Sequence, residues 1–135
     1  MIKTYFSKEF IALEDKITKC TPTYPKGHEP NYIIPSEYCD HRFAIGRLGN
    51  NPLVVICMNP SAANDESSDK TINRIIAISE KLGMDGWVVF NTYPERATDA
   101  KMISKYDGDL SKQNINIICD FLIKHNVYEV WAAWG

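Results

Sequence analysis

The stretch "VVICMNPSAANDESSDKTINRII", from Val54 to Ile76, decides the fold. It begins with a β-branched apolar run, continues through Asn-Pro-Ser and a series of small or acidic residues, and ends in a helical pattern. A connection between a strand and a helix usually needs only about 2–6 residues. A longer polar connection at the carboxyl end of a buried strand is where α/β proteins tend to place a binding site. The stretch therefore predicts a strand, a site-bearing loop and a helix, in that order.

The remaining chain continues this alternation of strand and helix. Apolar or alternating runs predict strands at 42–48, 53–57, 86–91 and 127–134. The first of these alternates in a way that favours an edge strand. Apolar residues at helical spacing predict helices at 70–82 and 110–125, and the apolar face of the second comprises Ile115, Ile118, Cys119, Leu122 and Ile123. The first helix should end at Leu82-Gly83, because glycine is a common residue just beyond a helix.

Buried strands joined by helices pair in parallel through right-handed crossovers, with helices on the faces of the sheet. We therefore expect an α/β protein: a three-layer sandwich with a central, mainly parallel sheet. Residues 53–57, 87–91 and 128–133 should be neighbouring parallel strands. In that arrangement the loops that begin at Asn59 and Asn91 leave the same edge of the sheet and face each other.

The length of 135 residues predicts a single domain. Residues 1–41 should form an N-terminal helix and an irregular lead-in. The helix is expected at 7–19 with Ser7 as its N-cap, and residues 20–41 contain four prolines without a sustained period. Residues 42–135 should form the α/β core.

The composition is that of an ordinary soluble globular protein, with 44% hydrophobic and 24% charged residues. A net charge of −2 provides no bulk attraction to nucleic acid or to an anionic membrane. No apolar run approaches the roughly 20 residues of a membrane span. The four cysteines include no C-x-x-C pair and are expected to be reduced, mostly buried thiols. We therefore expect a cytoplasmic protein without membrane contact, and the motifs predict no metal and no cofactor.

Two asparagines end buried strands in the same way. Asn59 precedes Pro60, which fixes the backbone and lacks an N–H, and Asn91 ends the next strand. Asn-Pro-Ser is also a common way to open a turn, with Ser61 as a local hydrogen bonder. The pattern therefore leaves two interpretations, a simple turn or two carboxamides that converge on a ligand or a water.

The acidic residues of the long loop also allow two roles. Asp69 is well placed to cap the following helix. Together with Asp65 and Glu66 it could instead bind a divalent metal through oxygen atoms, although three acids in a short segment are more often a solvated loop.

Arginines are confined to the region around these loops. The chain has eleven lysines spread over its length, but its arginines are only Arg42, Arg47, Arg74 and Arg96. Arginine can bind phosphate or carboxylate with two parallel hydrogen bonds, which lysine cannot do. For Arg96 the alternatives are an internal carboxylate or a phosphate from a ligand; the internal candidates are Asp65, Asp69 and Asp99. Trp134 either packs in the core or stacks on a ring at the sheet edge.

Residues 42–135 carry several short motifs in one order. They are Asn59-Pro60-Ser61; Asp69, Thr71 and Arg74; Asn91 with Arg96-Ala97-Thr98-Asp99; and Ala133-Trp134-Gly135. This set resembles the family of bacterial and phage proteins known as domain of unknown function number sixteen forty-three. The resemblance adds Thr71, Arg74, Thr98, Asp99 and Trp134 to the candidate ligand-binding residues, but implies no established activity. The chain departs from the family pattern at Ala62 and Lys70, where the family usually has Thr and Pro.

A second resemblance is to the uracil-DNA glycosylase superfamily. The strand, Asn-Pro and long loop of this chain are similar to the corresponding element of that superfamily. Its mismatch-specific branch has G-I-N-P-G there, and the Asn positions the hydrolytic water. The resemblance implies a catalytic role for Asn59 and a fold like that of these glycosylases. Here Cys57 and Ser61 replace the two glycines, so the backbone should approach a base less closely.

These motifs support hypotheses from different classes. The first is a cleft for a nucleobase, nucleotide or nucleic acid, with Asn59 orienting water or base for glycosylase-like hydrolysis and Arg96 or Arg74 binding phosphate. The second is a non-catalytic module that binds a nucleotide or a partner protein, and in the third the polar residues only hold the loops together. Family members generally continue beyond A-W-G, so we also expect residues 1–135 to be C-terminally truncated, catalytically inert, and prone to dimerise through exposed apolar surface.

Overall fold

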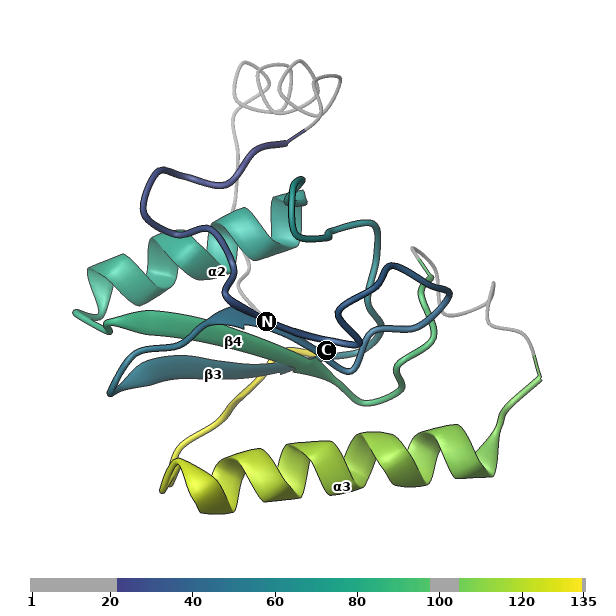
Figure 1. The fold of residues 1–135 in the computed structure, drawn as a ribbon. Helices are drawn as coiled ribbons and strands as arrows, with labels where there is room; N and C mark the ends of the chain where they lie inside the picture. The colour runs from purple at the N-terminus through teal and green to yellow at the C-terminus, as the bar shows by residue number, and fades with distance from the viewer. Residues whose placement is uncertain (1–21, 98–104, 135) are drawn as a thin grey trace.

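The computed structural model describes residues 22–97 and 105–134 (Figure 1). Five strands and two helices follow each other along the chain: β1 (Tyr32–Ile34), β2 (Ala44–Arg47), β3 (Pro52–Cys57), α2 (Lys70–Lys81), β4 (Gly86–Asn91), α3 (Gly108–Lys124) and β5 (Trp131–Ala132). The helix predicted at 7–19 lies outside the described residues. The α/β class is confirmed.

One sheet contains all the strands, in the order β1-β2-β4-β3-β5. Strand β3 pairs in parallel with β4 on one side and with β5 on the other, as the alternation of strands and helices predicts. Strand β5 is shorter than the predicted strand at 127–134 and pairs only through Trp131 and Ala132. The predicted parallel neighbourhood of these three strands is confirmed.

The other side of the sheet differs from the prediction. Strand β2 pairs antiparallel with β4, and β1 pairs antiparallel with β2, so the sheet is mixed rather than mainly parallel. Strand β2 is not the edge strand, because Ile45 is paired with Ile33 of β1 as well as with Val89 of β4. The proline-rich segment at 20–41 therefore includes an edge strand. A strand of three residues has too few positions to show alternation in the sequence.

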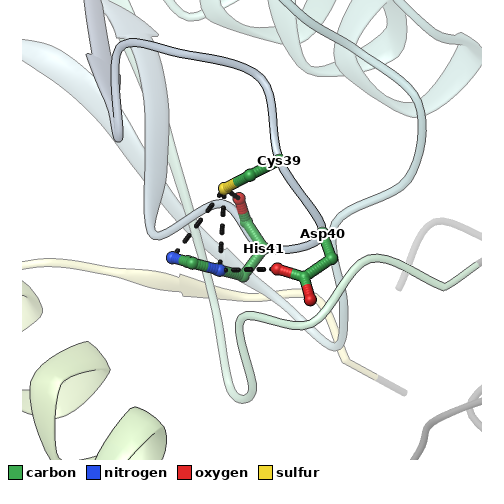
Figure 2. Close-up of side chains that lie close together, drawn as sticks. All are labelled: Cys39, Asp40 and His41. Atoms are coloured by element: carbon green, nitrogen blue, oxygen red, sulfur yellow. Dashed lines mark hydrogen bonds and ion pairs between the residues drawn. The ribbon is translucent and has the colours of Figure 1, made fainter.

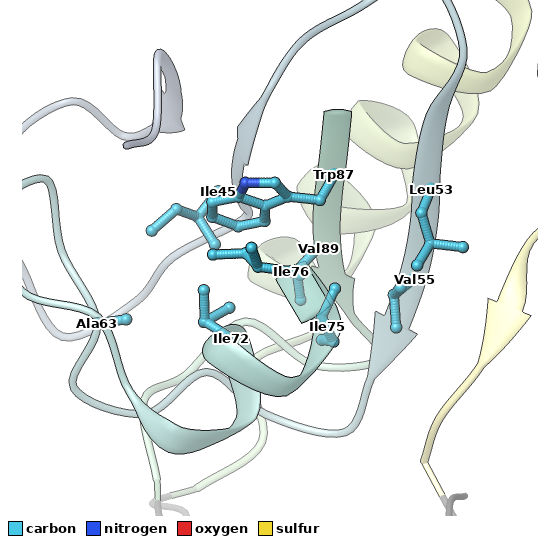
Figure 3. Close-up of a cluster of buried hydrophobic side chains, with 9 residues drawn as sticks. All are labelled: Ile45, Leu53, Val55, Ala63, Ile72, Ile75, Ile76, Trp87 and Val89. Carbon is cyan, nitrogen blue, oxygen red and sulfur yellow. The ribbon is translucent and has the colours of Figure 1, made fainter. Parts of the chain in front are cut away.

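The two helices lie on opposite faces of the sheet (Figure 1). Helix α2 turns the fully buried Ile72, Ile75 and Ile76 towards the sheet, where they belong to one cluster with Trp87 and Val89 (Figure 3). Burying such a side chain contributes roughly 1.5–3 kcal/mol relative to leaving it exposed. The isoleucine spacing therefore accounts for both the formation of α2 and its position.

Helix α3 covers the opposite face through Phe121. Its ring packs edge-on against Phe90 of β4, with the ring centroids 5.1 Å apart. The predicted apolar face of this helix is wrong in part, because Ile115, Cys119 and Ile123 are exposed while Asn114 is buried. The expectation that the cysteines are mostly buried is therefore wrong for Cys119. The amide of Asn114 donates to the main-chain oxygen of Asn91, at 2.8 Å. The hydrogen bond from Asn114 to the last residue of β4 thus helps to set the rotation of α3 about its axis.

Both ends of α2 follow the sequence signals. Asp69 is its N-cap and Leu82 its C-cap. Gly83 then adopts a positive φ of 70°, a conformation that glycine reaches without steric cost. The predicted end of this helix is confirmed. Within the described ranges, no helix is both long and apolar enough to cross a membrane.

Candidate functional site

The loops after β3 and β4 meet at one edge of the sheet. Cys57 and Asn91 are paired in the parallel ladder. Beyond them the main-chain N–H of Thr92 donates to the oxygen of Cys57 at 2.8 Å, and that of Tyr93 donates to Met58 at 3.2 Å. The prediction that these two loops face each other is confirmed.

A third segment reaches the same edge, because β2 is antiparallel to β4 and its amino end lies beside the carboxyl end of β4. The N–H of Arg42 donates to the oxygen of Pro94 at 2.9 Å, and the N–H of Arg96 donates to that of Asp40 at 2.8 Å. We call residues 38–43, 58–69 and 92–97 together the polar edge. The sequence did not predict the first of these segments.

The side chain of Asn59 is half-buried and held by the facing loop. Its Nδ2 donates to the main-chain oxygens of Tyr93, at 3.4 Å, and Glu95, at 3.3 Å. These contacts direct the amide nitrogen towards the loop and therefore direct Oδ1 away from those carbonyls. Asn59 can therefore present an acceptor to a water or to the N–H of a ligand.

The second predicted carboxamide, Asn91, lies in the interior. Its side chain is 1% exposed, and neither Nδ2 nor Oδ1 has a hydrogen-bond partner within the described chain. An amide without partners in the interior is costly, by about 1–3 kcal/mol. Asn91 therefore does not expose its side chain to solvent as Asn59 does.

Asp69 and Ser61 hold the long loop against the start of α2. The Oδ1 of Asp69 accepts from the N–H of Ile72 at 2.8 Å, which is the predicted N-cap bond. Its Oδ2 accepts from the hydroxyl of Ser61 at 2.7 Å. Both oxygens are thus used within the protein. Within the described residues Asp65 and Glu66 do not gather with Asp69 into a group of possible metal ligands.

Arg96 links all three segments of the polar edge. Its Nε donates to the main-chain oxygen of Cys39 at 2.8 Å, and its Nη1 donates to the oxygens of Ser61, at 2.5 Å, and Ala63, at 3.1 Å. The guanidinium also lies over the ring of Tyr38, 3.9 Å from its centroid. Partial burial lowers the pKa of Arg96. Arg96 is therefore a structural link between the loops.

The carboxylates predicted as internal partners of Arg96 are those of Asp65, Asp69 and Asp99. Neither Asp65 nor Asp69, both within the described segments, forms a salt bridge with it. Asp99 lies outside the described residues. The described partners of the guanidinium are therefore main-chain oxygens and an aromatic ring, which leave its positive charge without a neutralising carboxylate among them.

A second buried arginine, which sequence reasoning did not assign to the site, supports the same loop. Arg42 is 2% exposed, and its Nη1 donates to the oxygen of Ala63 at 2.9 Å, the same oxygen that Arg96 contacts. Its Nε has no hydrogen-bond partner. Burial, and then the nearby charge of Arg96, lower the pKa of Arg42 to about 10. The grouping of arginines in the sequence was a signal, but only the antiparallel β2 brings Arg42 inside.

The remaining candidate residues are more scattered. Thr71 and Arg74 are exposed on α2. Trp134 is 44% exposed and follows β5, whose neighbour Ala133 donates its N–H to the oxygen of Ile56 at 2.8 Å. The chain at Trp134 therefore leaves the sheet at the same edge as the carboxyl end of β3. Thr98 lies outside the described residues, like Asp99.

Comparison with known proteins places the chain in a family. A family model described as protein of unknown function (DUF1643) matches residues 42–135, and the chain belongs to that family. A search of curated proteins and a search of solved structures each return no match. The match begins at Arg42 and covers every described segment of the polar edge except residues 38–41.

Proposed function

We propose that the polar edge binds the base and phosphate of a nucleotide or nucleic acid, as part of a site that acts on the base. The observation that carries the proposal is the fixed carboxamide of Asn59, whose Nδ2 is engaged by Tyr93 and Glu95. An oriented acceptor of this kind can receive the N–H of a base or a hydrogen of a water.

The charge of the polar edge supports an anionic ligand. Arg42 and Arg96 place two guanidiniums against one carbonyl oxygen, that of Ala63. Like charges this close repel each other in a partly buried environment, and a phosphate beside Arg96 would relieve that repulsion. Arginine also recognises phosphate with better geometry than lysine does. Trp134, at the same edge of the sheet, offers a partly exposed ring on which a base can stack.

Glycosylase-like hydrolysis is the reaction that this arrangement would serve. As the similarity to uracil-DNA glycosylases implies, Asn59 would orient a water for attack on the glycosidic bond, and a base in a duplex would first be flipped out of the stack. On this proposal the fold, with helices on both faces of its sheet, is also of the glycosylase type, a three-layer sandwich.

A second function, binding without catalysis, is favoured by one observation. Hydrolysis is helped by a group that accepts a proton from the water. Both carboxylate oxygens of Asp69 already accept hydrogen bonds, from Ile72 and Ser61. Residues 1–135 are therefore expected to recognise the ligand without hydrolysing it.

The test measures binding and base release separately. Free nucleobases, nucleoside monophosphates and short single-stranded DNA are titrated into the protein, and release of free base from DNA is assayed in parallel. The variant Asn59→Ala removes the acceptor. Asn51→Ala is the matched control, because Asn51 carries the same side chain near the opposite end of β3, where its Nδ2 hydrogen-bonds to the sulfur of Met84.

Binding that Asn59→Ala weakens about tenfold or more, the equivalent of one lost hydrogen bond, supports the proposal if Asn51→Ala leaves it unchanged. If the wild type also releases free base and Asn59→Ala abolishes this release, the site is catalytic as well. Binding without base release selects the non-catalytic module. A protein that binds none of these ligands would refute both functions and leave the polar contacts with a purely structural role.

A further inference from the structure

Three consecutive side chains ahead of β2 bring a thiol, a carboxylate and an imidazole together (Figure 2). The Sγ of Cys39 lies 3.6 Å from Nδ1 of His41 and 3.9 Å from its Nε2. The Oδ1 of Asp40 lies 2.9 Å from the same Nδ1. One potential ligand atom from each residue lies within 4.8 Å of the others. Among the described residues, this is the one group of three or more such side chains.

We propose that Cys39, Asp40 and His41 bind a thiophilic divalent cation such as Zn²⁺. Zinc takes thiolate, imidazole and carboxylate ligands in a tetrahedron, with Zn–S near 2.3 Å and Zn–N near 2.0–2.1 Å, so the sulfur and nitrogen of two ligands lie about 3.5 Å apart. The separation of 3.6 Å between Sγ and Nδ1 matches this edge. The site would supply three protein ligands and leave the fourth position to water or to another ligand.

Without a metal ion, the side chains of Cys39, Asp40 and His41 hydrogen-bond to one another. With Nδ1 protonated, His41 donates to Asp40, and metal binding replaces that proton because a ligating nitrogen must be free of it. The sulfur is almost equally far from both ring nitrogens, so the side chain of Cys39 or His41 has to rotate before both face one ion. The thiol proton also leaves, since the thiolate is the ligand.

Charge and exposure agree with a cation at this place. A thiolate and a carboxylate carry one negative charge each, so with Zn²⁺ and a neutral imidazole the site has no net charge. The guanidinium of Arg96, which donates to the oxygen of Cys39, is therefore not opposed by a second net positive charge. The side chain of Asp40 is 89% exposed and that of His41 is 29% exposed, which gives an ion and a water access from solvent.

The backbone that carries the ligands is held from two sides. Arg96 donates its N–H to the oxygen of Asp40 at 2.8 Å, in addition to the bond from its side chain to Cys39. The ring of His41 packs edge-on against Phe43, with the centroids 5.1 Å apart. Contacts of this kind orient metal ligands before the ion binds. Sequence motifs do not indicate this site, because three consecutive ligands match none of the spaced zinc motifs.

The experiment titrates Co²⁺ and Zn²⁺ into the full 135-residue chain under reducing conditions. Co²⁺ reports a thiolate ligand by a sulfur-to-metal charge-transfer band in the near ultraviolet, and calorimetry gives the stoichiometry and affinity for Zn²⁺. The variants are Cys39→Ser, His41→Ala and Asp40→Asn. The matched control is Cys119→Ser, which removes an exposed thiol from α3.

The expected result is one ion per chain, with a charge-transfer band that Cys39→Ser abolishes and Cys119→Ser retains. His41→Ala and Asp40→Asn should each weaken Zn²⁺ binding at least tenfold. Asp40→Asn keeps the test valid if another variant fails to fold, because this side chain is almost fully exposed. Absence of binding by the wild type, a band that persists in Cys39→Ser, or unchanged affinity in Asp40→Asn would overturn the proposal. The inference does not depend on the proposed nucleotide site.

Discussion

The two edges of the sheet hold their loops with side chains of opposite charge. At the amino end of β4, the exposed carboxylate of Asp85 accepts the N–H groups of Asn50 and Asn51, both at 2.7 Å. At the carboxyl end, the half-buried Arg96 donates to main-chain oxygens. One edge therefore joins loops through an anion in solvent, and the other through a half-buried cation.

The sign and burial of these charges affect how each edge would interact with an anion. At the Asp85 edge, the charged group is negative and its surroundings are solvated, so a phosphate would be repelled. At the polar edge, Arg42 and Arg96 add positive charge where solvent screens it less. The same difference in burial determines how strongly each contact stabilises the fold, because a hydrogen bond lost in the interior leaves groups without water to replace it.

The largest effect is expected for Arg96→Lys. Lysine keeps the charge but cannot reach Cys39, Ser61 and Ala63 together, since a single ammonium replaces the planar guanidinium. The free energy of unfolding should fall by about 2–3 kcal/mol, the value of one or two hydrogen bonds to a charged group. Chemical denaturation measures it.

The control for this prediction is Arg47→Lys. Arg47 also donates to a main-chain oxygen, that of Glu29 at 2.9 Å, but this hydrogen bond is exposed, whereas those of Arg96 are part-buried. Its replacement should change stability by less than about 0.5 kcal/mol, as is usual for surface substitutions. Equal losses in the two variants would show that a part-buried contact of an arginine stabilises the fold no more than an exposed one. An unchanged stability in Arg96→Lys would show that the three main-chain contacts do not hold the loops.

A smaller effect is expected at the opposite edge for Asp85→Asn. The substitution keeps the shape of the side chain but replaces one acceptor oxygen by a donor that faces an N–H of Asn50 or Asn51. Stability should fall by about 1 kcal/mol, since the contact is exposed and water can replace it. Thermal unfolding measures this value. A loss as large as that of Arg96→Lys would contradict the assignment of the stronger link to the polar edge.

The smallest effect concerns the pH dependence of Cys57, at the carboxyl end of β3. Burial raises the pKa of this thiol from 9.0 to about 11. The unfolded chain therefore releases the proton first as the pH rises, so this contribution to stability is fully present below pH 9 and is lost between pH 9 and about 11. Cys57→Ser should remove that part of the pH dependence of unfolding.

Alkylation rates provide an independent measurement of the same property. At pH 9 the thiol of Cys57 should react at least about tenfold more slowly than the exposed thiol of Cys119, because the thiolate is the reactive form. Mass spectrometry of the alkylated peptides gives both rates. Comparable rates would show that the interior behind the polar edge is open to solvent.

Helix α3 shows how far periodicity alone predicts packing. Its apolar residues are numerous enough to indicate a helix, and the helix is present. The residues that bury against the sheet include Asn114 and Phe121, whereas Ile115 and Ile123 remain exposed. Ile118 and Leu122 of the predicted apolar face do pack against the core, and the buried amide of Asn114 bonds a strand end, so apolar packing and one polar contact together orient the helix.

The sequence by itself determined the elements that depend on neighbouring residues. The apolar run of β3, the isoleucine spacing of α2, the cap at Asp69 and the meeting of the two loops after β3 and β4 were all predictable. The first three have a local physical origin, since burial repeats with the period of a strand or helix and a cap bonds an N–H three residues away. The meeting of the loops follows from the parallel pairing that an alternation of buried strands and helices implies.

The tertiary structure alone decided the partners of the charged and polar side chains. Whether Arg96 meets a carboxylate, a phosphate or a carbonyl depends on which segments lie beside it. The antiparallel strands β1 and β2 bring residues 38–43 there. The same pairing buries Arg42 and places Cys39, Asp40 and His41 beside the polar edge. These contacts join residues far apart in the chain, and no local period encodes them, because a hydrogen bond between distant segments depends on how the whole sheet is assembled.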